Sequence, residues 1–197
     1  MTLAAVERPL IVDLNSDLGE GVAREADLLP LITTANVACG GHAGDAPTML
    51  ATLRLAARHG VRVGAHPGFF DREHFGRREL TREPADVLAD CLYQVGALRA
   101  LADRLGLNLT HIKPHGALYN LAMRRQDLAD VLVEVARQFR LPLMGLPGSC
   151  VERACRGVVP YIAEGFADRR YRPDGSLVPR SEPGSVIESA DEAVTQA

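Results

Sequence analysis

Short runs of apolar and β-branched residues alternate along the chain with longer stretches in which apolar residues recur at helical spacing. The short runs predict six strands, over residues 10–15, 33–39, 62–66, 109–115, 142–147 and 161–166. This alternation is typical of parallel strands joined by crossover helices, because hairpins would place one strand directly after another. Six such units predict a barrel or a doubly wound sheet.

Helical spacing predicts three helices between these strands, over residues 47–59, 84–105 and 127–139. Two long polar connections, 67–80 and 167–183, follow strands, and loops of that length in a compact domain often carry function. Near the end of the chain, Ser189 and Glu192 have the spacing of a capping box, which predicts that a helix begins there. The sequence stops at Ala197, so the last unit looks short.

The composition fits one globular domain over residues 1–197. The chain is 47% hydrophobic, which provides enough apolar material for a sizeable core. Its formal net charge is -3, with charges of both signs interspersed, so nucleic acids and anionic membranes are not expected partners. No stretch approaches the roughly 20 apolar residues that span a bilayer.

The cysteines and the first residues predict a cytoplasmic protein. The four cysteines have no CxxC spacing and are too few to indicate a disulfide scaffold. The N-terminal segment meets Glu7 and Arg8 before any long apolar run, so it lacks the core of a signal peptide.

Ionisable and polar side chains collect where the predicted strands end. In parallel α/β folds the carboxyl ends of the strands share one cleft, so these side chains are expected to lie together. They are Asp13, Asn15 and Asp17 at the first strand, His42 and Asp45 after the second, His66 at the third, Lys113 and His115 on the fourth, and Glu164, Asp168 and Arg169 after the sixth.

Taken singly, several of these residues have a simple structural interpretation. Asp45 stands before Pro47 and suits a helix N-cap, and Asp13 suits a carboxylate that holds a loop. His111 begins its strand, which favours a structural role, and Cys39 has no evident partner base, which favours a packed thiol. Together, however, so many ionisable groups at one edge of a sheet favour a functional site.

Two chemistries suit this set. One is a divalent-metal hydrolase site in which the ion activates water, with ligands drawn from Asp13, Asp17, His42, His66 and His115. The other uses a carboxylate as general base without a metal, while Lys113, Arg169 and the histidines stabilise anionic oxygens. No H-x-H or H-E-x-x-H spacing decides between them, and no Walker motif is present to bind ATP.

The same residues lie in motifs that resemble the LamB/YcsF family. The matching segments are DLNSDLGEG (13–21), TTANVACGGHAGD (33–45), VGAHPGFFD (63–71), FGRREL (75–80), YQVGAL (93–98), HIKPHGALYN (111–120), EGFADRRY (164–171) and LVPR (177–180). They occur in order over nearly the whole chain, which makes chance similarity implausible.

The resemblance implies an α/β fold, a distorted parallel (β/α) barrel of the glycoside hydrolase/deacetylase type. It also implies a hydrolase acting on a cyclic amide: the A subunit of an ATP-dependent 5-oxoprolinase, which opens 5-oxo-L-proline to L-glutamate. The partner subunits B and C would handle ATP, and this subunit would add water. A divalent metal is compatible with the resemblance, and so is a homo-oligomer.

The resemblance also implies roles for the site residues. Asp13 or Asp17 would activate water, and the histidines would relay protons or hold a metal. Lys113 and Arg169 would neutralise carboxylate or phosphate oxygens. Substrate-binding and orienting roles would fall to Asn15, Asp45, Glu164 and Arg169.

The sequence departs from the family pattern in two places. Gly41 stands where the family usually has an aromatic residue, and Ala46 separates Asp45 from Pro47, which the family usually has adjacent. Family members also continue by about one strand and helix, with a late histidine, so a barrel short of its last unit is expected. Two rival functions therefore stay open: a stand-alone metal-dependent amidase or deacetylase, and a catalytically inactive binding or scaffold subunit.

Overall fold

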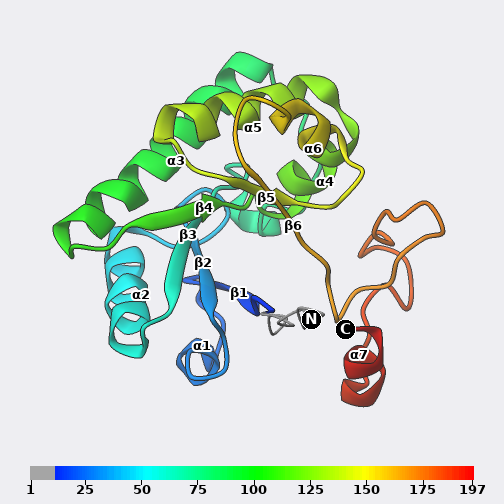
Figure 1. The fold of residues 1–197 in the computed structure, drawn as a ribbon, viewed down its shortest axis with the longest axis horizontal. Coiled ribbons are helices and arrows are strands. Elements are labelled where there is room, and N and C mark those ends of the chain that lie inside the picture. The colour runs from blue at the N-terminus through cyan, green and yellow to red at the C-terminus, as the bar shows by residue number, and fades with distance from the viewer. Residues whose placement is uncertain (1–11) are drawn as a thin grey trace, which may run out of the picture.

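One sheet of six parallel strands forms the centre of the computed structural model, which describes residues 12–197. The strands are β1 (Asn15–Leu18), β2 (Thr34–Ala38), β3 (Arg62–His66), β4 (Leu109–Ile112), β5 (Leu143–Gly145) and β6 (Tyr161–Ala163), and each pairs with the next along the chain. The sheet curls into a half-barrel (Figure 1). Within residues 12–197, β1 and β6 do not pair, so the expected distorted (β/α) barrel short of a unit is confirmed.

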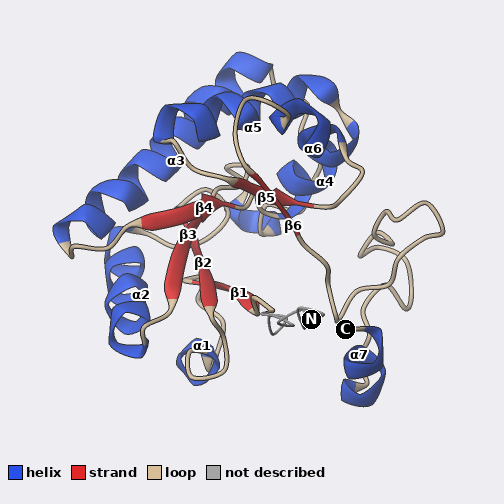
Figure 2. Cartoon of the chain, viewed as in Figure 1, coloured by secondary structure: helices blue, strands red, loops and turns tan. Residues whose placement is uncertain are grey.

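The helices are α1 (Glu25–Leu28), α2 (Ala46–His59), α3 (Pro84–Arg104), α4 (Gly116–Arg124), α5 (Gln126–Phe139), α6 (Cys150–Cys155) and α7 (Ala190–Gln196), with a 3₁₀ helix, η1 (Arg72–His74). Helices α2, α3 and α5 lie in an arc outside the sheet (Figure 2). The three helices predicted from periodicity are confirmed. The predicted start of a helix at Ser189 is confirmed too, because the Ser189 hydroxyl accepts a hydrogen bond from the Glu192 backbone N–H at the start of α7. No helix within residues 12–197 is long and apolar enough to cross a membrane.

The first strand begins later than the sequence predicts. Residues 10 and 11 of the predicted strand lie outside the described residues, and β1 starts only at Asn15. Asp13 precedes it and bonds to the hydroxyls of Thr33 and Thr34, at the amino end of β2. Its carboxylate also lies 2.8 Å from Arg62, at the amino end of β3. The placement of Asp13 at the carboxyl end of the sheet is therefore wrong; the alternating polar residues belong to β1 itself.

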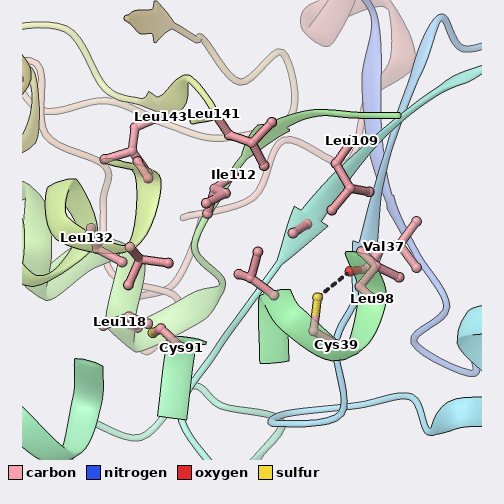
Figure 3. Close-up of a cluster of buried hydrophobic side chains, with 14 of the residues drawn as sticks. Val37, Cys39, Cys91, Leu98, Leu109, Ile112, Leu118, Leu132, Leu141 and Leu143 are labelled. Atoms are coloured by element: carbon pink, nitrogen blue, oxygen red, sulfur yellow. Dashed lines mark hydrogen bonds between the residues drawn. The ribbon is translucent and has the colours of Figure 1, made fainter. Parts of the chain in front are cut away.

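The hydrophobic core fills the space between the sheet and helices α3 and α5 (Figure 3). On α5, Leu128, Leu132 and Val135 are buried at positions i, i+4 and i+7, as an amphipathic helix requires. Each such side chain contributes roughly 1.5–3 kcal/mol by leaving water. Cys39 belongs to this core, where burial raises the pKa of its thiol to about 12, in agreement with the interpretation as a packed thiol.

Gly64 of β3 leaves room for a buried histidine on the neighbouring strand. A Cβ at residue 64 would overlap the ring of His111, whose Nδ1 would lie 2.6 Å away. The His111 ring is only 2% exposed, and its Nε2 lies 2.6 Å from the side-chain oxygen of Asn36. His111 therefore has the structural role expected from the sequence.

We expect Gly64→Ala to lower the free energy of unfolding by about 1–3 kcal/mol, because the added methyl group overpacks the His111 ring. Urea denaturation measures the effect. Gly96→Ala is the matched control, since its Cβ would meet only Phe139, at 3.7 Å, and alanine favours the interior of α3. Equal urea midpoints for Gly64→Ala and the unmodified protein would contradict this packing.

Candidate active site

The carboxyl ends of the strands open into a cavity of about 660 Å³. Its polar lining comes from the ends of β1, β3 and β4, from helix α4 and from the loops that follow η1 and β6. The lining side chains with ionisable or hydroxyl groups are Asp17, Glu20, His66, Arg77, Glu79, Lys113, His115, Tyr119, Arg169, Arg180 and Ser181. Asp17, His66, Lys113 and His115 thus lie together at the carboxyl ends of the strands, as the sequence predicts.

Three histidines and a glutamate form a tight cluster beside this cavity. Ligand atoms of Glu20, His42, His66 and His115 all lie within 4.8 Å of one another. The rings of His42 and His115 are stacked with centroids 3.6 Å apart, and His66 stands perpendicular to both. Glu20 Oε1 lies 3.0 Å from His42 Nε2 and 3.3 Å from His115 Nδ1. The cluster therefore directs four donor atoms to one point.

Backbone carbonyls set the tautomers of two of these histidines. His66 Nδ1 donates to the Lys113 carbonyl at 2.7 Å, and His115 Nε2 donates to the Phe75 carbonyl at 2.9 Å. Carbonyl oxygens only accept, so the remaining nitrogens, His66 Nε2 and His115 Nδ1, face the centre of the cluster. Within the described chain, the buried Nδ1 of His42 has no hydrogen-bond partner, so the group that contacts its Nε2 decides its tautomer.

This donor set fits a divalent cation such as Zn²⁺. Imidazole nitrogens and a carboxylate are its usual ligands, and ligand histidines usually donate their other N–H to a carbonyl or carboxylate. Burial and the charge of His66 lower the pKa of both His42 and His115 to about 2, which keeps them in the neutral form that binds metals. The pKa of His66 is raised instead, because Asp17 outweighs the effect of burial. The four side chains thus form a candidate metal-binding cluster.

Lys113 lies beside the cluster, held by three oxygen atoms. Its Nζ is 3.0 Å from Glu164 Oε2, 3.3 Å from Asp17 Oδ1 and 3.1 Å from Asn15 Oδ1. Burial opposes the charge of this ammonium group, but Asp17 and Glu164 raise its pKa above the ordinary value. Lys113 is therefore a cation at neutral pH, suited to stabilise a negative oxygen and not to accept a proton.

The pKa values of Asp17 and Glu20 are shifted in opposite directions. Burial opposes ionisation of Asp17, yet His66 and Lys113 hold its pKa well below the usual range. Burial raises the pKa of Glu20, which the neighbouring histidines only partly offset. A base works best when its pKa lies near the working pH, so Glu20 suits that role better than Asp17.

Sequence reasoning missed six of the cavity's ionisable or hydroxyl side chains: Glu20, Arg77, Glu79, Tyr119, Arg180 and Ser181. Glu20 could have been found, since it follows Asp17 by three residues, in the loop directly after β1. Tyr119 is buried on α4, and its hydroxyl has no hydrogen-bond partner within residues 12–197. The two arginines come from loops that fold back over the strand ends, and such contacts leave no local pattern in a sequence.

The remaining predicted residues lie around the cluster or away from it. Asn15 and Glu164 hold Lys113, and Arg169 lines the cavity. Asp45 is exposed and caps α2 by accepting a hydrogen bond from the Thr48 amide at 2.9 Å. That geometry matches the capping interpretation of Asp45, and Asp45 does not line the cavity.

The described residues match one known protein family along their whole length. The model of the LamB/YcsF family matches residues 12–197. The chain belongs to the LamB/YcsF family. A solved structure of the lactam utilization protein from Thermus thermophilus is similar to this LamB/YcsF chain, with a TM-score of 0.89 and 44% sequence identity. The match covers 94% of this chain and 78% of the Thermus chain.

A second solved structure is more distant. It is named as a putative cellobiose-phosphate cleavage protein from Enterococcus faecalis V583, with a TM-score of 0.47 and 18% identity. The match covers 76% of the LamB/YcsF chain and 65% of that protein. This likeness is too low to carry an argument about function.

The structure gives a physical reason for the glycine at position 41 of this LamB/YcsF chain. A Cβ there would overlap the Gln94 side chain and lie 2.6 Å from the Gly68 carbonyl oxygen. Gln94 is buried and bonds to both the amide and the carbonyl of Gly68, at 3.0 and 2.8 Å. The space next to His42 is therefore filled by Gln94 and leaves no room for a side chain on residue 41.

Proposed function

We propose that this chain adds water to the lactam of 5-oxo-L-proline, as the A subunit of an ATP-dependent 5-oxoprolinase with partner subunits B and C. The observation that carries the proposal is the cluster of Glu20, His42, His66 and His115 beside the Lys113 ammonium group. This combination offers a base, a metal site and a stabilising cation in one cavity. The similarity to a lactam utilization protein supports the choice of a cyclic amide as substrate.

The roles follow from the charges of the side chains. A divalent cation, when bound by His42, His66 and His115, would lower the pKa of water. Glu20, outside that ligand set, accepts the proton of the attacking water, a role that its raised pKa suits. Lys113 stabilises the negative charge that develops on the carbonyl oxygen. Asp17 stays ionised and orients Lys113 and His66, from which it lies 3.3 Å in each case.

The overall reaction requires one bond to form and one to break. The water oxygen bonds to the carbonyl carbon, the ring C–N bond breaks, and a proton passes to the ring nitrogen, which becomes the amino group of glutamate. Resonance stabilises the lactam, so phosphorylation of its carbonyl oxygen would give a better electrophile. In that case a second water molecule releases the phosphate, so that ATP, 5-oxo-L-proline and two waters give ADP, phosphate and L-glutamate. We assign that ATP-dependent step to the partner subunits, because residues 1–197 contain no Walker motif.

We also place the complex in the cytoplasm. All four cysteines, Cys39, Cys91, Cys150 and Cys155, are free and buried. Thiols that remain unpaired are the usual state in a reducing compartment.

The test is glutamate release from 5-oxo-L-proline and ATP by this chain mixed with B and C subunits. We expect glutamate only when all three chains are present, because the activation of the lactam and its hydrolysis are divided between them. Activity of this chain alone on a simple amide with added Zn²⁺ would favour the amidase or deacetylase. If partners that work with another A subunit give no glutamate with this one, the scaffold function replaces our proposal.

A further inference from the structure

Three arginines line the same cavity as the histidine cluster: Arg77, Arg169 and Arg180. Other arginines nearby pair with glutamates, at 2.5–2.6 Å: Arg124 with Glu79, Arg170 with Glu192 and Arg172 with Glu182. Within residues 12–197, by contrast, none of the three cavity arginines forms an ion pair with a carboxylate. The three arginines, called here the cationic wall, therefore have no carboxylate in direct contact. Glu79, which also lines the cavity, pairs with Arg124, and Asp17 and Glu20 act on Arg77 only from farther away.

Arg169 is the fixed centre of this wall. Its side chain is 6% exposed, and its guanidinium donates only to backbone carbonyls, of Ser185 at 3.3 Å and Val178 at 2.7 Å. Carbonyl groups satisfy hydrogen bonds but do not neutralise a buried charge, which is costly without an anion. The unused edge of the guanidinium is therefore available for an anion in the cavity.

Helix α7 holds the loop that presents Arg169. The side-chain Nε2 of Gln196 donates hydrogen bonds to the backbone carbonyls of Phe166, Ala167 and Arg169, at 2.8, 3.1 and 2.8 Å. Figure 1 shows this segment, in orange to red, leaving the sheet after β6. These contacts hold the backbone around Arg169 in one conformation.

The three positive charges also act on one another. The pKa of Arg169 is lowered by burial and by Arg180, and the pKa of Arg77 is lowered by the same two causes. The Arg77 guanidinium lies 4.9 Å from the centre of the Phe75 ring, a contact that favours the cation without neutralising it. An anion bound between these groups would relieve the repulsion.

We propose that Arg77, Arg169 and Arg180 bind the carboxylate of the substrate, so that the protein takes acidic lactams in preference to neutral ones. This inference rests on the proposed function. The carboxylates of Asp17 and Glu20 repel a second carboxylate at the other polar part of the cavity. An acidic lactam is therefore bound in one orientation, with its carboxylate at the arginines and its amide carbonyl at Lys113 and the histidines.

The test compares two lactams that differ only in the carboxylate, 5-oxo-L-proline and 2-pyrrolidinone. Calorimetric titration of the full chain is expected to show at least about tenfold tighter binding of the acidic lactam. Arg77→Gln and Arg180→Gln should each weaken that binding about tenfold and leave the affinity for the neutral lactam unchanged. Arg99→Gln removes the same charge from an exposed pair on α3 and is the control.

Each outcome separates this inference from the proposed function. If the unmodified protein binds both lactams with equal affinity, the proposal that the arginines bind the substrate carboxylate is wrong, and the proposed lactam substrate is retained. If neither lactam binds but inorganic phosphate does, and Arg77 and Arg180 are required, the oxyanion belongs to a phosphate group and the lactam assignment fails. If none of the three compounds binds, both proposals are wrong. Circular dichroism of the variants confirms that they are folded.

Discussion

Replacing His66 by alanine is expected to weaken both the binding of Zn²⁺ and the release of glutamate severely. The ring is 1% exposed, and its Nε2 lies 3.0 Å from His115 Nδ1 and 3.3 Å from Asp17. Losing this nitrogen removes one of the imidazole ligands, so the affinity for Zn²⁺ should fall by about 100-fold or more. Glutamate release with the partner subunits should fall below about one per cent of the original rate.

His59→Ala is the matched control for this experiment. His59 is exposed in the last turn of α2, outside the cluster, so the same substitution there should change neither quantity. Calorimetry with Zn²⁺ and the glutamate assay measure the two effects separately. Loss of activity in His66→Ala, together with no Zn²⁺ binding by the unmodified protein, would favour the alternative in which the histidines act without a metal.

Most of the site residues at the strand ends could be predicted from the sequence. His66 is the last residue of β3 and Lys113 comes directly after β4, so their position at the carboxyl edge of a parallel sheet follows from where these strands are predicted to end. Asp13 shows where that reasoning fails. In β1, polar residues alternate inside the strand itself, and only the register with β2 reveals that Asp13 lies at the opposite end.

Of the cationic wall, Arg169 was predicted from its place after the sixth strand, but Arg77 and Arg180 could not be predicted in this way. Arg169 and Arg180 reach the cavity because Gln196 and the Ser185 carbonyl hold a long loop in place. These contacts join residues 16 and 27 positions apart in a segment without regular strands. The spacing of hydrophobic residues therefore cannot predict them. The sequence supplied the charges of the site, and the loop contacts decide which of them face the substrate.

Lys113→Met is expected to destabilise the fold as well as to stop the reaction. Removing the ammonium group leaves Glu164, whose side chain is 3% exposed, and Asp17, which is about one third exposed, without their shared cation. Breaking a buried ion pair costs about 3–5 kcal/mol. We expect the lower part of that range in urea denaturation, because water still reaches Asp17. An unchanged unfolding free energy would contradict the buried pairing.

A second substitution separates the structural role of Lys113 from its role in the reaction. Lys113→Met combined with Glu164→Gln removes both charges of the 3.0 Å pair, so part of the lost stability should return. The double variant should still release no glutamate, because no cation remains to stabilise the carbonyl oxygen. Strictly additive losses of stability would mean that the two groups do not interact. Activity in the double variant would assign Lys113 to the fold alone and require another group, such as the Tyr119 hydroxyl, to stabilise the oxygen.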